Sequence, residues 1–185
     1  SERFEEALHL LKPLAEKGDD RAELFMGIML SKGSGVQKDP ALALDWFRKS
    51  AQKGNSGAQY NIGLMYELGE GTGKDLSKAV SWYENAAKQG LSLAQYSLGN
   101  KYRLGEGVKK NEAQAADYYR LAAQQDLSDA QFNLGLMYLE GRGVAKSRAL
   151  SLKWLVRAAN QNHPGAIEAL KKLLLRGPRT LGYET

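Results

Sequence analysis

One pattern of small residues returns every 36 residues along this chain, and it restricts the possible folds more than any other feature. The rows are Ala22, Ala58, Ala94, Ala130 and Ala166; Gly27, Gly63, Gly99 and Gly135; and the pairs Gly33/Gly35, Gly69/Gly71, Gly105/Gly107 and Gly141/Gly143. A period of this length over four copies is typical of stacked repeats, in which each unit contacts only its neighbours. The sequence therefore predicts an elongated repeat array.

Each full repeat reads as two helices joined by a Gly-x-Gly turn. In the second copy the pattern predicts helices over 57–68 and 76–88. Gly63 falls inside the first, where glycine costs about 1 kcal/mol relative to alanine. Its recurrence in four copies indicates a close approach of the partner helix that a side chain would block.

The residues around the turns predict where the helices begin and end. The row Asp39, Asp75, Asn111 and Ser147 supplies good N-caps for the second helices, and Pro40 suits a first helical position. Gly54 and Gly90 are expected to close second helices, and Asp126 and Asn162 hold the same row in later copies.

The two ends of the array depart from the full repeat. Residues 4–17 match the second helix of a repeat that lacks its first half, which either caps the array or was cut from a longer chain. Pro13 is expected to interrupt or kink this helix. In the last copy Lys171 stands in the glycine row, as expected of an atypical terminal unit.

We therefore expect one array over 1–175. Its parts are a partial repeat at 1–19, full repeats at 20–55, 56–91, 92–127 and 128–163, a cap helix at 164–175, and a flexible tail at 176–185.

Composition excludes several classes of site and leaves the compartment open. The chain has no cysteine, which excludes disulfides, thiolate metal sites and a cysteine nucleophile. No apolar run approaches the length needed to span a membrane, and the opening residues carry no signal-peptide pattern. Both a cytoplasmic and a periplasmic or secreted location remain possible. A net charge of +5 is spread over every repeat, which favours solubility over polyanion binding.

The aligned copies give the consensus A-x-Y-x-L-G-x-x-Y-x-x-G-x-G-V-x-x-D-x-x-K-A-x-x-W-Y-x-x-A-A-x-x-G, which resembles the Sel1-like repeat family, relatives of the tetratricopeptide repeats. The match is close over 20–163; Leu30, Ser50 and Leu155 depart from it and bear on packing. The resemblance implies an all-α fold, a right-handed α-solenoid of antiparallel helix pairs with a concave surface. It also implies an adaptor that binds proteins or peptides and carries no chemistry of its own.

In related tetratricopeptide arrays, positions of the first helices line the groove. Carried over by register, the resemblance implies groove positions in each of the four full repeats. The residues predicted to bind a partner are ten of these: Tyr60, Asn61, Leu64, Glu67, Tyr96, Asn100, Arg103, Phe132, Asn133 and Leu136. The aromatic members either face the groove or are buried between helices. The asparagines and Arg103 are expected to be exposed, since an amide can hold a peptide backbone and a guanidinium can grip a carboxylate.

No motif predicts catalysis, a cofactor or a metal. The stretch 70–75 (EGTGKD) is similar to a phosphate loop, but Leu68 and Asp75 break the Walker pattern and the loop recurs as a turn in later copies. His9 and His163 lie at opposite ends of the array and are expected on the surface. We therefore predict that the protein is not an enzyme.

Two functions remain after these exclusions. The favoured one is a monomeric scaffold that binds a protein or an extended peptide on its concave surface. The alternative is nucleic-acid binding, suggested by the charge of +5 and by helical-repeat proteins that read RNA one base per unit. The groove positions are mostly neutral, which makes nucleic acid the less favoured partner.

Overall fold

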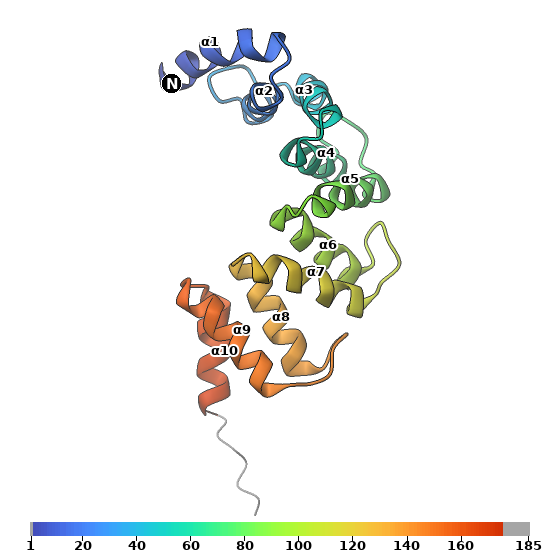
Figure 1. Ribbon diagram of the computed structural model, residues 1–185, viewed down its shortest axis with the longest axis vertical. Helices are drawn as coiled ribbons and strands as arrows, with labels where there is room; N and C mark the ends of the chain where they lie inside the picture. Colours follow the sequence, from blue (N-terminus) through green and yellow to red (C-terminus); the bar gives the residue numbers. More distant parts are fainter. Residues whose placement is uncertain (1, 176–185) are drawn as a thin grey trace, which may run out of the picture. The chain divides into compact units, whose positions relative to one another are not determined.

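The structure is a computed structural model that describes the backbone of residues 2–175 and the side chains of residues 6–175. Within that range the chain is all-α. The helices are α1 (Glu2–Glu16), α2 (Asp20–Lys32), α3 (Pro40–Gln52), α4 (Ser56–Leu68), α5 (Leu76–Lys88), α6 (Ser92–Leu104), α7 (Glu112–Gln124), α8 (Ser128–Glu140), α9 (Arg148–Asn160) and α10 (Pro164–Leu175) (Figure 1). The predicted tail, 176–185, lies outside the described residues.

The helices form sequential antiparallel pairs with a 36-residue repeat, so the predicted α-solenoid class is confirmed. Contacts divide the chain into one unit that ends at Lys110 and holds α1 to α6, and another that begins at Asn111 and holds α7 to α10. Within each unit, successive helices pack on one another. The core of each unit therefore lies between neighbours in sequence, as the repeat predicts.

The predicted N-caps start the second helices. The side chains of Asp39, Asp75, Asn111 and Ser147 each accept a hydrogen bond from the backbone N–H three residues on. Pro40 occupies the start of α3, where its missing N–H removes no helical hydrogen bond. Asp126 and Asn162 adopt positive φ angles of 61° and 62°, the left-handed conformation expected for that row.

The glycines inside the first helices α2, α4 and α8 make room for a side chain of the second helix. A Cβ at Gly63 would lie 2.5 Å from the ring of Tyr83, and one at Gly27 would lie 2.5 Å from the ring of Phe47. Both rings are almost completely buried. The predicted close approach is confirmed in these repeats, and an inserted ring accounts for it.

Of the two effects predicted for Pro13, an interruption or a kink, the interruption is wrong, because α1 continues through this residue to Glu16. The turn that follows is anchored from both sides. Lys17 donates its backbone N–H to the Pro13 carbonyl, and Ala15 is buried in a cluster with Ala22 and Met26 of α2. Tertiary packing thus offsets the hydrogen bond that proline removes.

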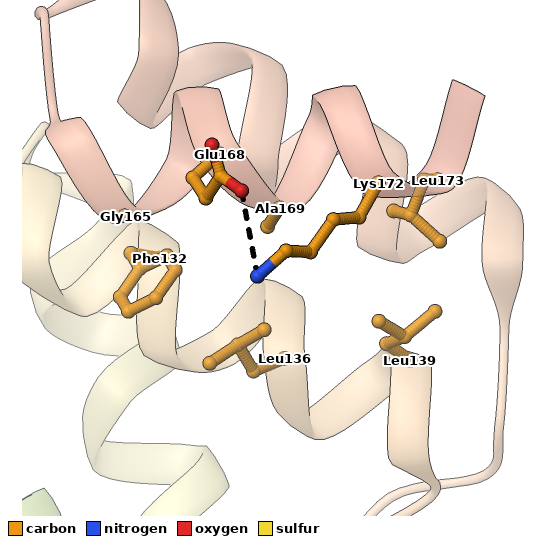
Figure 2. A pocket seen from close by; sticks show the side chains of 8 residues that line it. All are labelled: Phe132, Leu136, Leu139, Gly165, Glu168, Ala169, Lys172 and Leu173. Carbon is orange, nitrogen blue, oxygen red and sulfur yellow. Dashed lines mark ion pairs between the residues drawn. The ribbon is translucent and has the colours of Figure 1, made fainter. Parts of the chain in front are cut away.

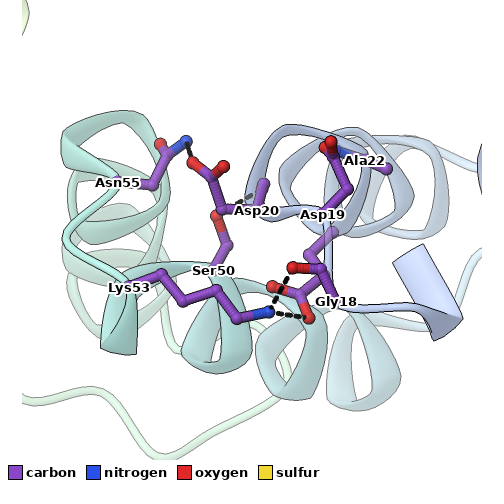
Figure 3. A network of polar contacts seen from close by, with 8 residues as sticks. Gly18, Asp19, Asp20, Ala22, Ser50, Lys53 and Asn55 are labelled. Atoms are coloured by element: carbon purple, nitrogen blue, oxygen red, sulfur yellow. Dashed lines mark hydrogen bonds and ion pairs between the residues drawn. The ribbon is translucent and has the colours of Figure 1, made fainter. Parts of the chain in front are cut away.

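A polar clasp joins the start of the first helix to the end of the second. In the repeat 20–55, Lys53 donates to Oε1 of Glu23 at 2.5 Å and to the Gly18 carbonyl at 2.9 Å (Figure 3). Asn55 and Ser50 both donate to Asp20, at 2.8 Å and 2.7 Å. Two other repeats replace the ion pair with glutamine pairs: Gln89 to Gln59 at 2.8 Å and Gln161 to Gln131 at 2.9 Å. The clasp position therefore accepts either chemistry.

The amide form of the clasp makes one bond that the ionic form lacks. Gln95 and Gln131 donate Nε2 to the carbonyls of Ala87 and Ala123 in the preceding repeat. Glu23 holds the same position, is only 3% exposed, and its Oε2 has no hydrogen-bond partner in the structure. A carboxylate has no N–H to donate, so the bond made by the glutamines is not available to it.

We predict that Lys53→Gln lowers the free energy of unfolding by about 1–3 kcal/mol, because it leaves a buried carboxylate without its cation. The double variant Glu23→Gln/Lys53→Gln should return to within about 1 kcal/mol of the parent, since it recreates the glutamine clasp. Urea unfolding measures both. A double variant no more stable than Lys53→Gln would contradict the equivalence of the two clasps.

Candidate functional site

The ten predicted partner-binding residues are all half-buried on the first helices α4, α6 and α8. We call this set of ten the first-helix stripe. Its aromatic members are only partly buried. The sequence predicted that its asparagines and Arg103 are exposed, but they too are half-buried. A half-buried position lets a side chain support the fold and still present atoms to a partner.

Three pockets lie between first helices of neighbouring repeats. The α2–α4 pocket, of about 200 Å³, is lined by Ser31, Lys32, Phe47, Asn61, Leu64, Met65, Leu68 and Glu70. The α4–α6 pocket, of about 330 Å³, is lined by Glu67, Ser97, Asn100, Lys101, Arg103, Leu104 and Glu106. The α8–α10 pocket, of about 340 Å³, is lined by Phe132, Leu136, Leu139, Gly165, Glu168, Ala169, Lys172 and Leu173. Seven members of the stripe line one of the three; Tyr60, Tyr96 and Asn133 line none of them.

The α8–α10 pocket is largely apolar. Figure 2 shows Phe132, Leu136 and Leu139 on α8 facing α10, with the Lys172 side chain extending across toward Glu168. The ammonium of Lys172 lies 3.4 Å from the Glu168 carboxylate, and both side chains are more than half exposed. An exposed pair of this kind contributes little to stability, so it can separate when a ligand enters.

His163 stands at the edge of this pocket, and the prediction that it lies on the surface is wrong. Its side chain is 13% exposed, and its ring stacks on Phe132 with centroids 4.5 Å apart. Nδ1 accepts the Ala166 backbone N–H at 3.1 Å, while Nε2 lies 3.2 Å from Asp129. His163 therefore caps α10, as Asp or Asn does at other helices. His9, by contrast, is exposed as predicted.

Two stripe residues of α4 have structural contacts. The Asn61 side-chain Nδ2 donates a hydrogen bond to the Gly57 carbonyl at 2.8 Å, so this amide nitrogen bonds within its own helix. The Tyr60 ring lies 5.5 Å from that of Tyr83, and burial raises the pKa of its hydroxyl despite a hydrogen bond with Ser97. Each therefore contributes to packing as well as to the stripe.

A charged network occupies the α4–α6 pocket. Lys101 donates to Oε1 of Glu67 at 2.6 Å and to Oε2 of Glu106 at 2.8 Å. The second oxygen of Glu67 accepts the Tyr83 hydroxyl at 2.6 Å. The Lys101 side chain is 5% exposed, whereas those of Glu67 and Glu106 are 29% and 45% exposed. A buried ammonium thus joins two carboxylates that border solvent.

The protonation of this network follows from its geometry. Burial by itself acts to lower the pKa of Lys101, but hydrogen bonds and charges from Glu106 and Glu67 outweigh it and the pKa is raised. The hydrogen bond from Lys101 lowers the pKa of Glu106. Burial is the main cause that raises the pKa of the Tyr83 hydroxyl, and its hydrogen bond to Glu67 is the next largest cause. The network therefore favours an ammonium at Lys101, an ionised Glu106 and a neutral Tyr83 phenol.

Lys101 was missed by the sequence reasoning, although the repeat contains a signal for it. The equivalent residues of the other full repeats are Met29, Met65 and Met137, all buried. A lysine in a row of buried methionines requires a nearby anion. An acidic residue close to it, such as Glu106, was the further clue.

Within residues 6–175 no three histidine or carboxylate side chains gather as a metal ion would require. Across the described helices none is both long and apolar enough to cross a bilayer.

In the loop that resembles a phosphate loop, Gly71 lies against the backbone of Pro40 in the preceding repeat. That contact gives the glycine a structural role.

Comparisons with known proteins agree with this architecture. The Sel1 repeat matches residues 20–55, 56–91, 92–127 and 128–163. A protective antigen of uropathogenic Escherichia coli with an SLR fold is 38% identical, with a TM-score of 0.89 over 92% of this chain and 36% of its own. A Sel1 repeat protein of Oxalobacter formigenes is 34% identical, with a TM-score of 0.86 over 92% of this chain and 50% of its own.

A third solved structure, cysteine rich protein B of Helicobacter pylori, is 26% identical, with a TM-score of 0.57 over 68% of this chain and 93% of its own. This chain thus spans half or less of the length of the first two structures. A comparison with curated proteins found no match. Because the four matched repeats cover most of the sequence and their boundaries agree with the helix pairs, the chain belongs to the Sel1 repeat family.

Proposed function

We propose that this protein is a non-catalytic interaction scaffold that binds a protein or an extended peptide on the first-helix faces of its repeats. The observation that supports this most is the position of the pockets. Each lies between first helices of adjacent repeats and is lined by residues of the first-helix stripe. A preformed surface loses little conformational freedom on binding, which favours affinity.

The pockets differ in chemistry, which supports selective binding. The α8–α10 pocket offers apolar walls, and the α4–α6 pocket offers charges and amides. The α2–α4 pocket combines Leu64 and Leu68 with Asn61 and Glu70. Within the unit that ends at Lys110, the α2–α4 and α4–α6 pockets have α4 as a common wall, so they can read different side chains of one extended segment.

The test is selection of binders from a random peptide library, followed by calorimetric titration of the selected peptides. A groove variant, Asn100→Ala/Arg103→Glu, changes two residues that line the α4–α6 pocket. Its matched control, Asn85→Ala/Lys88→Glu, makes an equal change of charge at two exposed positions of α5. We expect the groove variant to bind about tenfold more weakly or worse, a loss of about 1.4 kcal/mol, and the control to bind normally.

Thermal unfolding completes this test, because both variants should keep the melting temperature of the parent within a few degrees. Equal affinities for the two variants would reject the α4–α6 face as a binding surface. Titration of random single-stranded RNA across a salt series tests the competing function, since phosphate binding weakens steeply as salt rises.

A further inference from the structure

The charged network of the α4–α6 pocket contains one carboxylate that is held and one that can exchange. Glu67 lies on α4, and both of its oxygens are engaged, one by Tyr83 and one by Lys101. Glu106 lies in the loop after α6 and is 45% exposed. A half-exposed loop carboxylate bound to a buried ammonium is the member of the network that can leave with the least disturbance.

From this arrangement we propose that Lys101 binds an acidic side chain of the partner, and that Glu106 occupies this position until the partner displaces it. The proposal deepens the scaffold function proposed above and depends on it, because it names the chemistry of one binding position. The ligand is an Asp or Glu side chain within an extended segment.

The position of Lys101 supports a role beyond packing. Methionine fills the equivalent core position in three other repeats, so the fold does not require a charge there. Burying an ion pair is often no better for stability than an apolar residue of similar volume. Yet the Lys101 side chain lines the pocket beside two polar members, Ser97 and Asn100. The lysine therefore places a cation beside the binding face, at a core position that other repeats fill with an apolar residue.

The preceding repeat shows where Glu106 can go when it is displaced. Glu70 is its equivalent, and methionine stands there in place of Lys101. Glu70 pairs instead with Lys38 of the neighbouring loop, at 3.4 Å. The equivalent of Lys38 is Lys74, whose charge already helps to lower the pKa of Glu106. A displaced Glu106 thus has a second cation within its reach, which reduces the free-energy cost of exchange.

The pocket favours a side-chain carboxylate over a chain terminus. The α2–α4 pocket lies in the same unit, and the two pockets have α4 as a common wall. A side-chain carboxylate at Lys101 lets the segment continue in both directions and still fill both pockets, whereas a terminal carboxylate would end the segment there. The pocket volume of about 330 Å³ is ample for one acidic side chain.

The experiment titrates the full chain with three blocked amino acids and follows the NMR signals of Lys101 Nζ and of the Ser97 and Asn100 amides. The probes are N-acetyl-glutamate amide, N-acetyl-glutamine amide, and N-acetyl-glutamine with an unblocked carboxyl group. We expect saturable shifts at these atoms with the first probe and none with the second. Equal binding of the second would overturn the proposal, and stronger binding of the third would overturn the choice of a side chain.

Two variants test the exchange itself. Glu106→Gln removes the carboxylate that competes for Lys101. It should tighten binding of N-acetyl-glutamate amide by about fivefold or more, because the state in which Lys101 can accept a ligand becomes the major one. Lys101→Met should abolish the shifts while keeping the melting temperature, since methionine is the residue of the other repeats. A Glu106→Gln protein with unchanged affinity would overturn the role assigned to Glu106.

These titrations separate the inference from the scaffold function. A protein that binds selected peptides equally well with lysine or methionine at position 101 keeps its function and loses this subsite. If the protein selects no peptides but binds N-acetyl-glutamate amide at Lys101, the acidic subsite stands and the proposed scaffold function is rejected.

Discussion

Replacing Gly71 with alanine is expected to lower the free energy of unfolding by about 2–5 kcal/mol. Gly71 has a φ of +68°, which side chains with a Cβ rarely adopt. An added Cβ would also overlap the carbonyl of Pro40 at the start of α3, in the preceding repeat. A backbone carbonyl cannot rotate away as a side chain can, so the loop or the helix must shift. The effect therefore combines backbone strain with overpacking.

The same loop contains the matched control. Gly73 has no positive φ, and a Cβ there would have nothing within 4 Å. Gly73→Ala should change the free energy of unfolding by less than about 1 kcal/mol. Chemical unfolding of the two variants under the same conditions measures the difference. If both variants lost the same free energy of unfolding, the contact between this loop and α3 would not stabilise the array.

Tyr83→Ala is the second variant with a large expected effect, about 3–5 kcal/mol of lost stability. Tyr83 is fully buried, and its ring lies against Gly63 and beside the Tyr60 ring. Removing it leaves a cavity between α4 and α5 and takes the phenol donor away from Glu67. The loss of the ring should account for most of the effect, because a buried aromatic side chain contributes mainly through its area.

Tyr83→Phe separates the ring from its hydroxyl. Phenylalanine is the natural residue at the equivalent position 47, so the ring should fit and the cost should be about 1 kcal/mol for the lost hydrogen bond. Thermal and urea unfolding of both variants give the two contributions. If the phenylalanine variant lost as much as the alanine variant, the network with Glu67 and Lys101 would matter more to the fold than the packing of the ring does.

Most of the fold could be predicted from the sequence because local chemistry specifies it. The N-cap row and the glycines of the turns predict where the second helices begin and end. The helix predicted over 76–88 has these same bounds in the structure. Pro13 shows the limit of this reasoning. Its effect depends on whether the following turn is held by another helix, and burial of Ala15 against α2 supplies that hold.

The candidate site was less predictable from the sequence. The register places ten residues on the first helices, but it does not show whether the space beside them is open or filled. The roles of Asn61 and His163 depended on hydrogen bonds to Gly57 and Ala166. Lys101 gave only an indirect signal, since a lysine in a methionine row does not itself show which carboxylates reach it.

The 36-residue period determined by itself that this chain forms helix pairs stacked in order, because each pair has an apolar face that only the next pair can cover. The tertiary structure decided what lies between the helices: the three pockets, the rings against Gly27 and Gly63, and the partners of Lys101. The physical reason is the distance along the sequence over which the interactions act. Helix ends and turns depend on residues a few positions apart, whereas a pocket, or an ion pair such as that of Lys101 with Glu67, depends on side chains that packing brings together from neighbouring repeats.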